Sequence, residues 1–298
     1  ALVWLAGRLL PWLDGMPVAL WVAVDVAFLP LLALSLYRPL WGGQNRVNRL
    51  FLPLLLMMGL ANLLSQLQLL GSLNDIGDMR RTMLYLIVLL ITLVGGRVLP
   101  FFTRSVLPGF EPIGRPWVEH LTFALLASII LVESIASPPA ALSGPLWLAF
   151  ALVQAIRLGG WFDRRMLAIP VLWVLHLGYA WLVLGALLSG LAALELFPRG
   201  PALHALGVGA VGVFTIGMMA RVAHGHTGRP IDVGPGVTLA FLAVNAAALL
   251  RVFATVGWGS HHALWVDLSA ALWVIGFGLF AWHYVPILLR PRVDGKPG

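Results

Sequence analysis

The sequence contains no cysteine and few charged residues, and both absences restrict what the protein is. Without cysteine there are no disulfides, iron–sulfur clusters, thiolate-bound copper or thioether-attached haem, so any metal must be held by His, Met, Tyr or carboxylate ligands. Charged residues make up only 10% of the 298 residues and hydrophobic residues 60%. A soluble domain with this composition would expose large apolar patches. The sequence therefore predicts a protein whose solvent is lipid.

Alternation of polar and apolar residues with a period of two is also absent, which excludes strands and leaves an all-α bundle. A bilayer requires about 20 apolar residues per helix, and nine runs of this kind occur. They lie at 16–36, 50–70, 83–103, 117–137, 140–160, 167–189, 203–224, 235–256 and 262–286. Residues 1–12 read as the end of a tenth span. We therefore predict a single polytopic domain over residues 1–298 with about ten spans, and we expect helices to be missing before Ala1.

The formal net charge of +7 could suggest a nucleic-acid partner, but the basic residues form no face or arm. They lie in the short gaps between the apolar runs, where they act as topology signals. Alternate gaps hold thirteen against four Lys and Arg residues. The positive-inside rule then predicts that the C-terminus is cytoplasmic, together with the loops at 37–49, 104–116, 157–166 and 225–234.

Arg97 lies within an apolar run, where a cation is costly and must be paired. It could anchor an anionic group such as a haem propionate, or it could form a structural ion pair with a buried carboxylate. Asp25, near the middle of the first run, is the obvious internal candidate for that pairing. A proton-relay role is the functional interpretation of Asp25.

His176 lies in the middle of another span among bulky apolar residues, where an unpaired imidazole would be expensive. It is therefore either a metal ligand or a core histidine held by hydrogen bonds. Met218 and Met219, in the span at 203–224, could offer thioethers to Cu(I), but methionine in an apolar helix more often belongs to the core.

The segment 204–230 begins with His204 and has His226 near its end. The two histidines are 22 residues apart, about 33 Å along a helix, so they cannot share one metal. We predict two separate polar sites, one on each side of the membrane. Gly207, Gly209 and Gly212 in the same segment spell GxGxxG, but no strand precedes them, so close helix packing is the better explanation.

Six motifs in this sequence resemble segments of the NnrS family. They are WLAGRL at 4–9, NRLFLPLLLMMGLANLL at 48–64, GGRVLPFFT at 95–103, WVLHLGYAWLVLG at 173–185, HALGVGAVGVFTIGMMARVAHGHTGRP at 204–230 and YVPILLRPRVDGKPG at 284–298. The resemblance covers essentially the whole chain. It implies a bacterial inner-membrane protein of twelve spans, about two of them before Ala1, that contains non-covalent haem and copper.

The histidines that match the family are His176, His204 and His226, and the matching cations are Arg97 and Arg221. The resemblance implies that these five residues are the cofactor-binding candidates. Met218 is a further metal candidate because of its thioether and its place in the same span as His204. The family often has a histidine after the ANLL segment, where this chain has Gln66, a poor partner for haem iron.

The resemblance implies a role in nitric oxide metabolism or tolerance. Nitric oxide is then the expected ligand, bound or turned over in redox chemistry at haem with an electron donor that the sequence does not identify. The alternative is a multi-span transporter or permease for a metal ion or protons, which would use Asp25, Arg97 and the histidines. A purely structural protein would leave Arg97 and the buried histidines unexplained.

Overall fold

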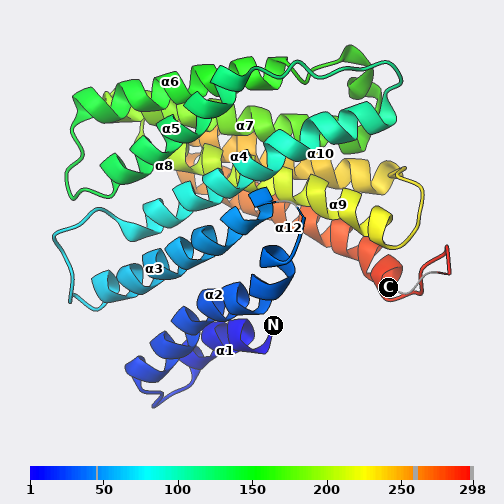
Figure 1. Cartoon of the computed structure of the whole chain (residues 1–298). Helices are drawn as coiled ribbons and strands as arrows, with labels where there is room; N and C mark the ends of the chain where they lie inside the picture. Colours follow the sequence, from blue (N-terminus) through cyan, green and yellow to red (C-terminus); the bar gives the residue numbers. More distant parts are fainter. Residues whose placement is uncertain (45, 258–260, 296–298) are drawn as a thin grey trace. The chain divides into compact units, whose positions relative to one another are not determined.

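A computed structural model describes residues 1–44, 46–257 and 261–295, and helices joined by short loops make up nearly all of them (Figure 1). Within these ranges, nine helical segments are long and apolar enough to cross a membrane. The predicted polytopic helical bundle is therefore confirmed. Asn45 lies outside the described residues, and so does Lys296, which was counted among the basic residues of the C-terminus.

The membrane-length helices follow the predicted runs closely. Their bounds are α2 (Val18–Trp41), α3 (Phe51–Leu69, preceded by η2, Arg46–Leu50), α4 (Met79–Val106), α5 (Pro116–Glu133), α6 (Ala140–Gly159), α7 (Pro170–Ala193), the run α8 (Arg199–His204), η4 (Ala205–Val213) and α9 (Phe214–His226), the run α10 (Pro235–Leu249), η5 (Leu250–Ala254) and α11 (Thr255–Gly257), and α12 (His262–Leu288). The partial first span appears as the short helix α1 (Leu2–Leu9).

Proline sets several of the helix starts. Pro116, Pro170 and Pro235 each occupy the first position of their helix, where the missing N–H costs nothing and the fixed φ angle already suits the helix. The η4 and η5 segments are π-helical, and an apolar run in the sequence does not predict this form of helix.

The chain divides into two compact units by the packing of its helices. Unit 1 comprises residues 1–90 and 130–138, and unit 2 comprises residues 91–129 and 139–298. The divisions fall within α4 and α5, so these two helices contribute to both units.

In unit 1, α2 packs against α1 and α3. Asp25 is buried in α2 and forms an ion pair with Arg8 of α1. Asn62 and Gln66 of α3 each donate a hydrogen bond of 3.0 Å to its Oδ2. Gln66 therefore donates a hydrogen bond to a buried carboxylate in this structure.

In unit 2, α6 packs on α7, α7 on η4, and α10 on α12. Glycines permit these close approaches. A Cβ atom on Gly209 would collide with the Trp181 ring, and one on Gly212 with the Trp273 ring, while Gly207 faces open space. Close packing, and not nucleotide binding, thus accounts for two of the three glycines of GxGxxG.

Candidate functional site

The most extensive buried polar feature that we describe in unit 2 is a hydrogen-bonded network around Arg157. Arg157 lies close to the end of α6 that is predicted to be cytoplasmic. Arg157 is 5% exposed. Its Nε and Nη2 donate to the two carboxylate oxygens of Glu119 on α5, at 2.7 and 2.5 Å. Its Nη1 donates to the Thr92 carbonyl of α4 at 2.9 Å and to the Tyr179 hydroxyl of α7 at 2.8 Å. One guanidinium therefore joins four helices.

The network continues from Tyr179 into the bundle. The Tyr179 hydroxyl donates to Gln154 Oε1 at 2.5 Å, and Gln154 Nε2 donates to the Thr122 hydroxyl at 3.0 Å. The Arg157 guanidinium also lies 5.0 Å from the centre of the Trp161 ring, within the range of a cation–π interaction. The side-chain donors of Arg157, Tyr179 and Gln154 in this network all have partners, as buried polar groups require.

The GGR motif explains how the arginine reaches α4. A Cβ atom on Gly96 would overlap the Arg157 guanidinium, and one on Gly95 would contact the Tyr179 ring. The two glycines thus open the surface of α4 to the network. Arg97, predicted as the buried cation of this motif, has an exposed side chain in the structure. The buried arginine at the glycine pair is Arg157, which the sequence analysis treated only as a topology signal.

His176 is buried and contacts the backbone of Trp161, the residue whose ring lies against this network. Its Nδ1 lies 2.9 Å from the Leu172 carbonyl and its Nε2 lies 3.2 Å from the Trp161 carbonyl. A hydrogen bond from Nδ1–H to a backbone carbonyl is the arrangement that usually orients a metal-binding histidine through its other nitrogen. In this structure, however, Nε2 faces a carbonyl oxygen, so ligation would require that contact to open.

His176 also lines an apolar pocket of about 480 Å³. The other lining residues, all apolar, are Leu158, Phe162, Met166, Leu167, Trp173, Leu177, Ala180 and Leu242. Leu167, Leu242 and Phe162 are about half exposed, so the pocket opens at the surface of the unit. Its volume lies within the roughly 300–1,000 Å³ range of small-molecule and cofactor sites.

The end of α9 carries the next group of candidates. Arg221 lies over the Phe102 ring, 4.3 Å from its centre, and its Nε is buried without a hydrogen-bond partner. The His226 side chain is exposed, and its carbonyl accepts a hydrogen bond from Arg292 at 2.8 Å. The buried histidine of this motif is His224, whose Nδ1 lies 2.5 Å from the Pro230 carbonyl. The position of His224, two residues before His226, gave no signal in the sequence that this histidine is the buried one.

His204 lies at the opposite end of the same helical run, half-buried beside Arg251 of η5. No hydrogen-bond partner is present for its ring nitrogens among the described residues. The run from Arg199 to His226 is continuous, as predicted, although its η4 part is π-helical. His204 and His226 therefore mark opposite ends of one membrane-length helix. Met218, between them, is half-buried in α9.

These candidates do not converge on one centre. Within the described ranges, no group of three or more His, Asp or Glu side chains is placed to hold a metal ion. The structure thus brings His176 to a pocket, leaves His204 and His226 at separate ends of a helix, and gives Arg221 an unsatisfied N–H.

The comparison with known proteins agrees with the resemblance of the motifs. A family model described as NnrS protein matches residues 1–292. No curated protein and no solved structure matches the chain.

Proposed function

The chain belongs to the NnrS family, and from this premise we propose that it is a bacterial inner-membrane protein of the nitric oxide response that binds haem non-covalently and carries copper. The family match over residues 1–292 is the observation that carries the proposal. The nine membrane-length helices make the protein multi-pass. The charge bias of its loops supports a cytoplasmic C-terminus.

For haem, His176 offers the best fit among the three candidate histidines. It supplies the only imidazole in the lining of the 480 Å³ pocket, and its Nδ1 already has the carbonyl contact that orients a ligand. An apolar wall and a single imidazole suit a flat, largely apolar macrocycle. Haem held by His176 would supply iron for nitric oxide binding or for redox chemistry with an external electron donor.

Arg221 and Arg97 remain the candidates for the propionate groups. Arg221 has a buried Nε without a partner, which an anionic oxygen would satisfy. His204 and His226 remain candidate ligands at the two ends of the α8–η4–α9 run, consistent with two separate sites. Because these residues and His176 do not converge, haem at each would be a distinct centre.

Copper fits the described residues less well. A closed site needs several His, Met or carboxylate ligands around one point, and no such group of three His, Asp or Glu residues occurs in the ranges that the structure describes. Met218, with His176, His204 or His226, stays a proposed copper ligand, but we derive no copper chemistry from this arrangement.

The test is the haem content of the purified protein and of the variants His176→Ala, His204→Ala and His226→Ala. We expect a Soret band in the wild type and at least a severalfold lower haem-to-protein ratio in His176→Ala, because its imidazole is the lining group that can bind iron. His120→Ala is the matched control, because His120 is an exposed histidine on α5. If all three variants keep wild-type haem content and spectrum, the assignment of these ligands is wrong.

A transporter is the second candidate, favoured by the buried ionisable residues Asp25 and Glu133. It predicts a protein that lacks haem when purified and moves protons or metal ions in proteoliposomes. A Soret band with no such flux would exclude it in favour of the haem protein.

A further inference from the structure

A second pocket, in unit 1, differs in character from the pocket of His176. It has a volume of about 280 Å³ and lies among α3, α4, the loop before α4 and the end of α5. Its lining consists of Met57, Leu60, Ala61, Leu64, Ile76, Met79, Thr82, Leu86, Ile130, Leu131 and Ser134. Leu60 is 56% and Leu131 72% exposed, so the pocket opens at the apolar surface that faces lipid in a membrane.

Two hydroxyls provide the only side-chain oxygens of the lining. Thr82 is buried, and its Oγ1 lies 3.5 Å from Ser134 Oγ, beyond the usual length of an O–H···O hydrogen bond. Ser134 donates its own hydrogen to the Ile130 carbonyl at 2.7 Å. The Thr82 hydroxyl thus has one long hydrogen bond, to Ser134, at the wall of an apolar pocket. Groups of this kind call for an explanation, and a bound ligand is one.

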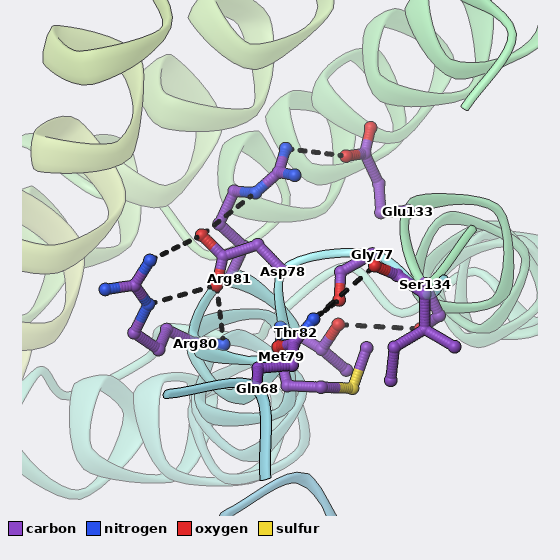
Figure 2. Close-up of polar contacts among 10 residues, drawn as sticks. Gln68, Gly77, Asp78, Met79, Arg80, Arg81, Thr82, Glu133 and Ser134 are labelled. Carbon is purple, nitrogen blue, oxygen red and sulfur yellow. Dashed lines mark hydrogen bonds and ion pairs between the residues drawn. The ribbon is translucent and has the colours of Figure 1, made fainter. Parts of the chain in front are cut away.

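An ion pair lies directly beside the two hydroxyls. Arg81 precedes Thr82 in α4, Glu133 precedes Ser134 at the end of α5, and the Arg81 Nη1 and Glu133 Oε2 atoms are 3.8 Å apart (Figure 2). Glu133 is 4% exposed. Arg81 Nη1 is buried and has no hydrogen-bond partner. The charges of this pair balance, and neither residue lines the pocket itself.

The backbone around the pocket is held firmly. Gln68 Nε2 donates to the Gly77 carbonyl at 2.9 Å and its Oε1 accepts from the Met79 N–H at 3.0 Å (Figure 2). The Gly77 N–H donates to the Ser134 carbonyl at 2.9 Å. A Cβ atom on Gly77 would overlap the backbone of residues 133–135, so only glycine permits this approach. The pocket is therefore a preformed feature of the fold.

The lining selects a neutral ligand. A phospholipid phosphate would meet no charged side chain among the lining residues, and its desolvation would go uncompensated. A neutral ring with carbonyl or hydroxyl oxygens would satisfy the Thr82 hydroxyl and fill the apolar remainder. The volume of 280 Å³ suits a single ring, while a long apolar tail would leave past Leu60 and Leu131 into lipid.

We propose that this pocket binds the head group of a membrane quinone or quinol, with a ring oxygen hydrogen-bonded to Thr82. On the predicted topology, the loops at 70–78 and 134–139 place it in the periplasmic leaflet. The inference concerns binding alone and does not require haem. If the proposed function holds, the ligand is a natural candidate for the electron donor.

The test is equilibrium binding of a radiolabelled short-chain benzoquinone to the full chain in detergent micelles. We expect saturable binding with one site, and a Kd raised about tenfold in Thr82→Val, which keeps the shape of the side chain and removes one hydrogen bond. Thr82→Ser should restore binding to within about threefold of the wild type, because the hydroxyl is kept. Thr215→Val is the matched control, since Thr215 is an exposed threonine on α9 of unit 2.

Photolabelling of the wild type with an azido derivative gives a readout that does not depend on any variant folding. The adducts should map to residues 57–64, 79–86 or 130–134. Non-saturable binding, equal affinity of Thr82→Val and the wild type, adducts confined to unit 2, or displacement by equimolar phosphatidylglycerol would each overturn the proposal. Haem content measured on the same samples separates the two hypotheses, because Thr82→Val should not alter it.

Discussion

Two arginine–glutamate pairs of this protein, each with one buried partner, are built in opposite ways. In unit 2, Arg157 binds Glu119 through two hydrogen bonds of 2.7 and 2.5 Å, and its remaining donor reaches a carbonyl and a hydroxyl. In unit 1, Arg81 and Glu133 approach only to 3.8 Å, and Arg81 Nη1 has no hydrogen-bond partner. Arg157 binds its glutamate through a bidentate hydrogen bond from its planar guanidinium. Arg81 interacts with Glu133 mainly through the attraction of opposite charges.

This difference in hydrogen bonding separates the structural role of Arg157 from the neighbourhood of Arg81, where we propose a ligand site. A buried ion pair is stable only when hydrogen bonds compensate the loss of water, and Arg157 meets this condition by joining α4, α5, α6 and α7. The Arg81 pair meets it less completely, and the weakly bonded Thr82 hydroxyl and the 280 Å³ pocket lie beside it. Incomplete hydrogen bonding next to a cavity is what a ligand site requires, whereas a complete network leaves no donor for a ligand.

The largest effect should come from replacing Arg157 with lysine, and the same replacement of Arg81 should have little effect. Arg157→Lys keeps the charge but loses the bidentate contact to Glu119 and the contact over Trp161, so we expect the free energy of unfolding to fall by about 2–3 kcal/mol. Arg81→Lys should change it by less than about 0.5 kcal/mol, because a 3.8 Å pair without a hydrogen bond needs only a cation. Thermal unfolding of the purified variants in one detergent measures both. Equal losses in the two variants would contradict the distinction between the pairs.

A smaller effect should follow from closing the space that Arg157 occupies on α4. Gly96→Ala places a methyl group where the guanidinium lies, so we expect about 1–3 kcal/mol of destabilisation from overpacking. Gly278→Ala in α12 is the control, because a Cβ atom there meets no neighbour within 4 Å. That control should be neutral or stabilising by up to about 1 kcal/mol, since alanine favours helix. If Gly96→Ala behaves like the control, the close approach of Arg157 to α4 is not needed for stability.

Hydropathy alone was sufficient to predict the helices, because each run must be apolar over the thickness of a bilayer whatever it packs against. It also located the candidate His176 correctly as a buried residue. The π-helical form of η4 and η5 could not be predicted, because side-chain pattern does not distinguish a helix with an extra residue per turn.

The pairing of polar residues was harder to predict than the helices. Arg97 and Arg157 both end or interrupt apolar runs, and only the packing of Gly96 decides which arginine is buried. In the same way, His224 and His226 are two residues apart, so they point to different faces of α9, and the sequence does not say which face meets Tyr284. Partners that lie far apart in the chain, such as Asp25 with Asn62, depend on tertiary contacts that a single sequence does not contain.

The smallest effect concerns a third acidic–basic pair, which extends the comparison to the surface. Asp163 and Arg165 lie in the loop between α6 and α7, and Arg165 Nη2 and Asp163 Oδ2 are 2.8 Å apart. The side-chain hydrogen bond from Arg165, followed by that from its backbone N–H, lowers the pKa of Asp163 from 3.8 to about 2. Because the folded pKa is below the unfolded value, the stabilisation is fully present above about pH 4 and is lost as the pH falls through about 2.

Asp163→Asn keeps an N-cap acceptor for η3 and removes the charge, whereas Asp163→Ala removes both. We therefore expect the difference in thermal midpoint between wild type and Asp163→Asn to be small, constant from pH 7 to 4, and to vanish toward pH 2, while the difference for Asp163→Ala persists. A difference for Asp163→Asn that stays unchanged down to pH 2 would show that the pair contributes through its geometry rather than its charge.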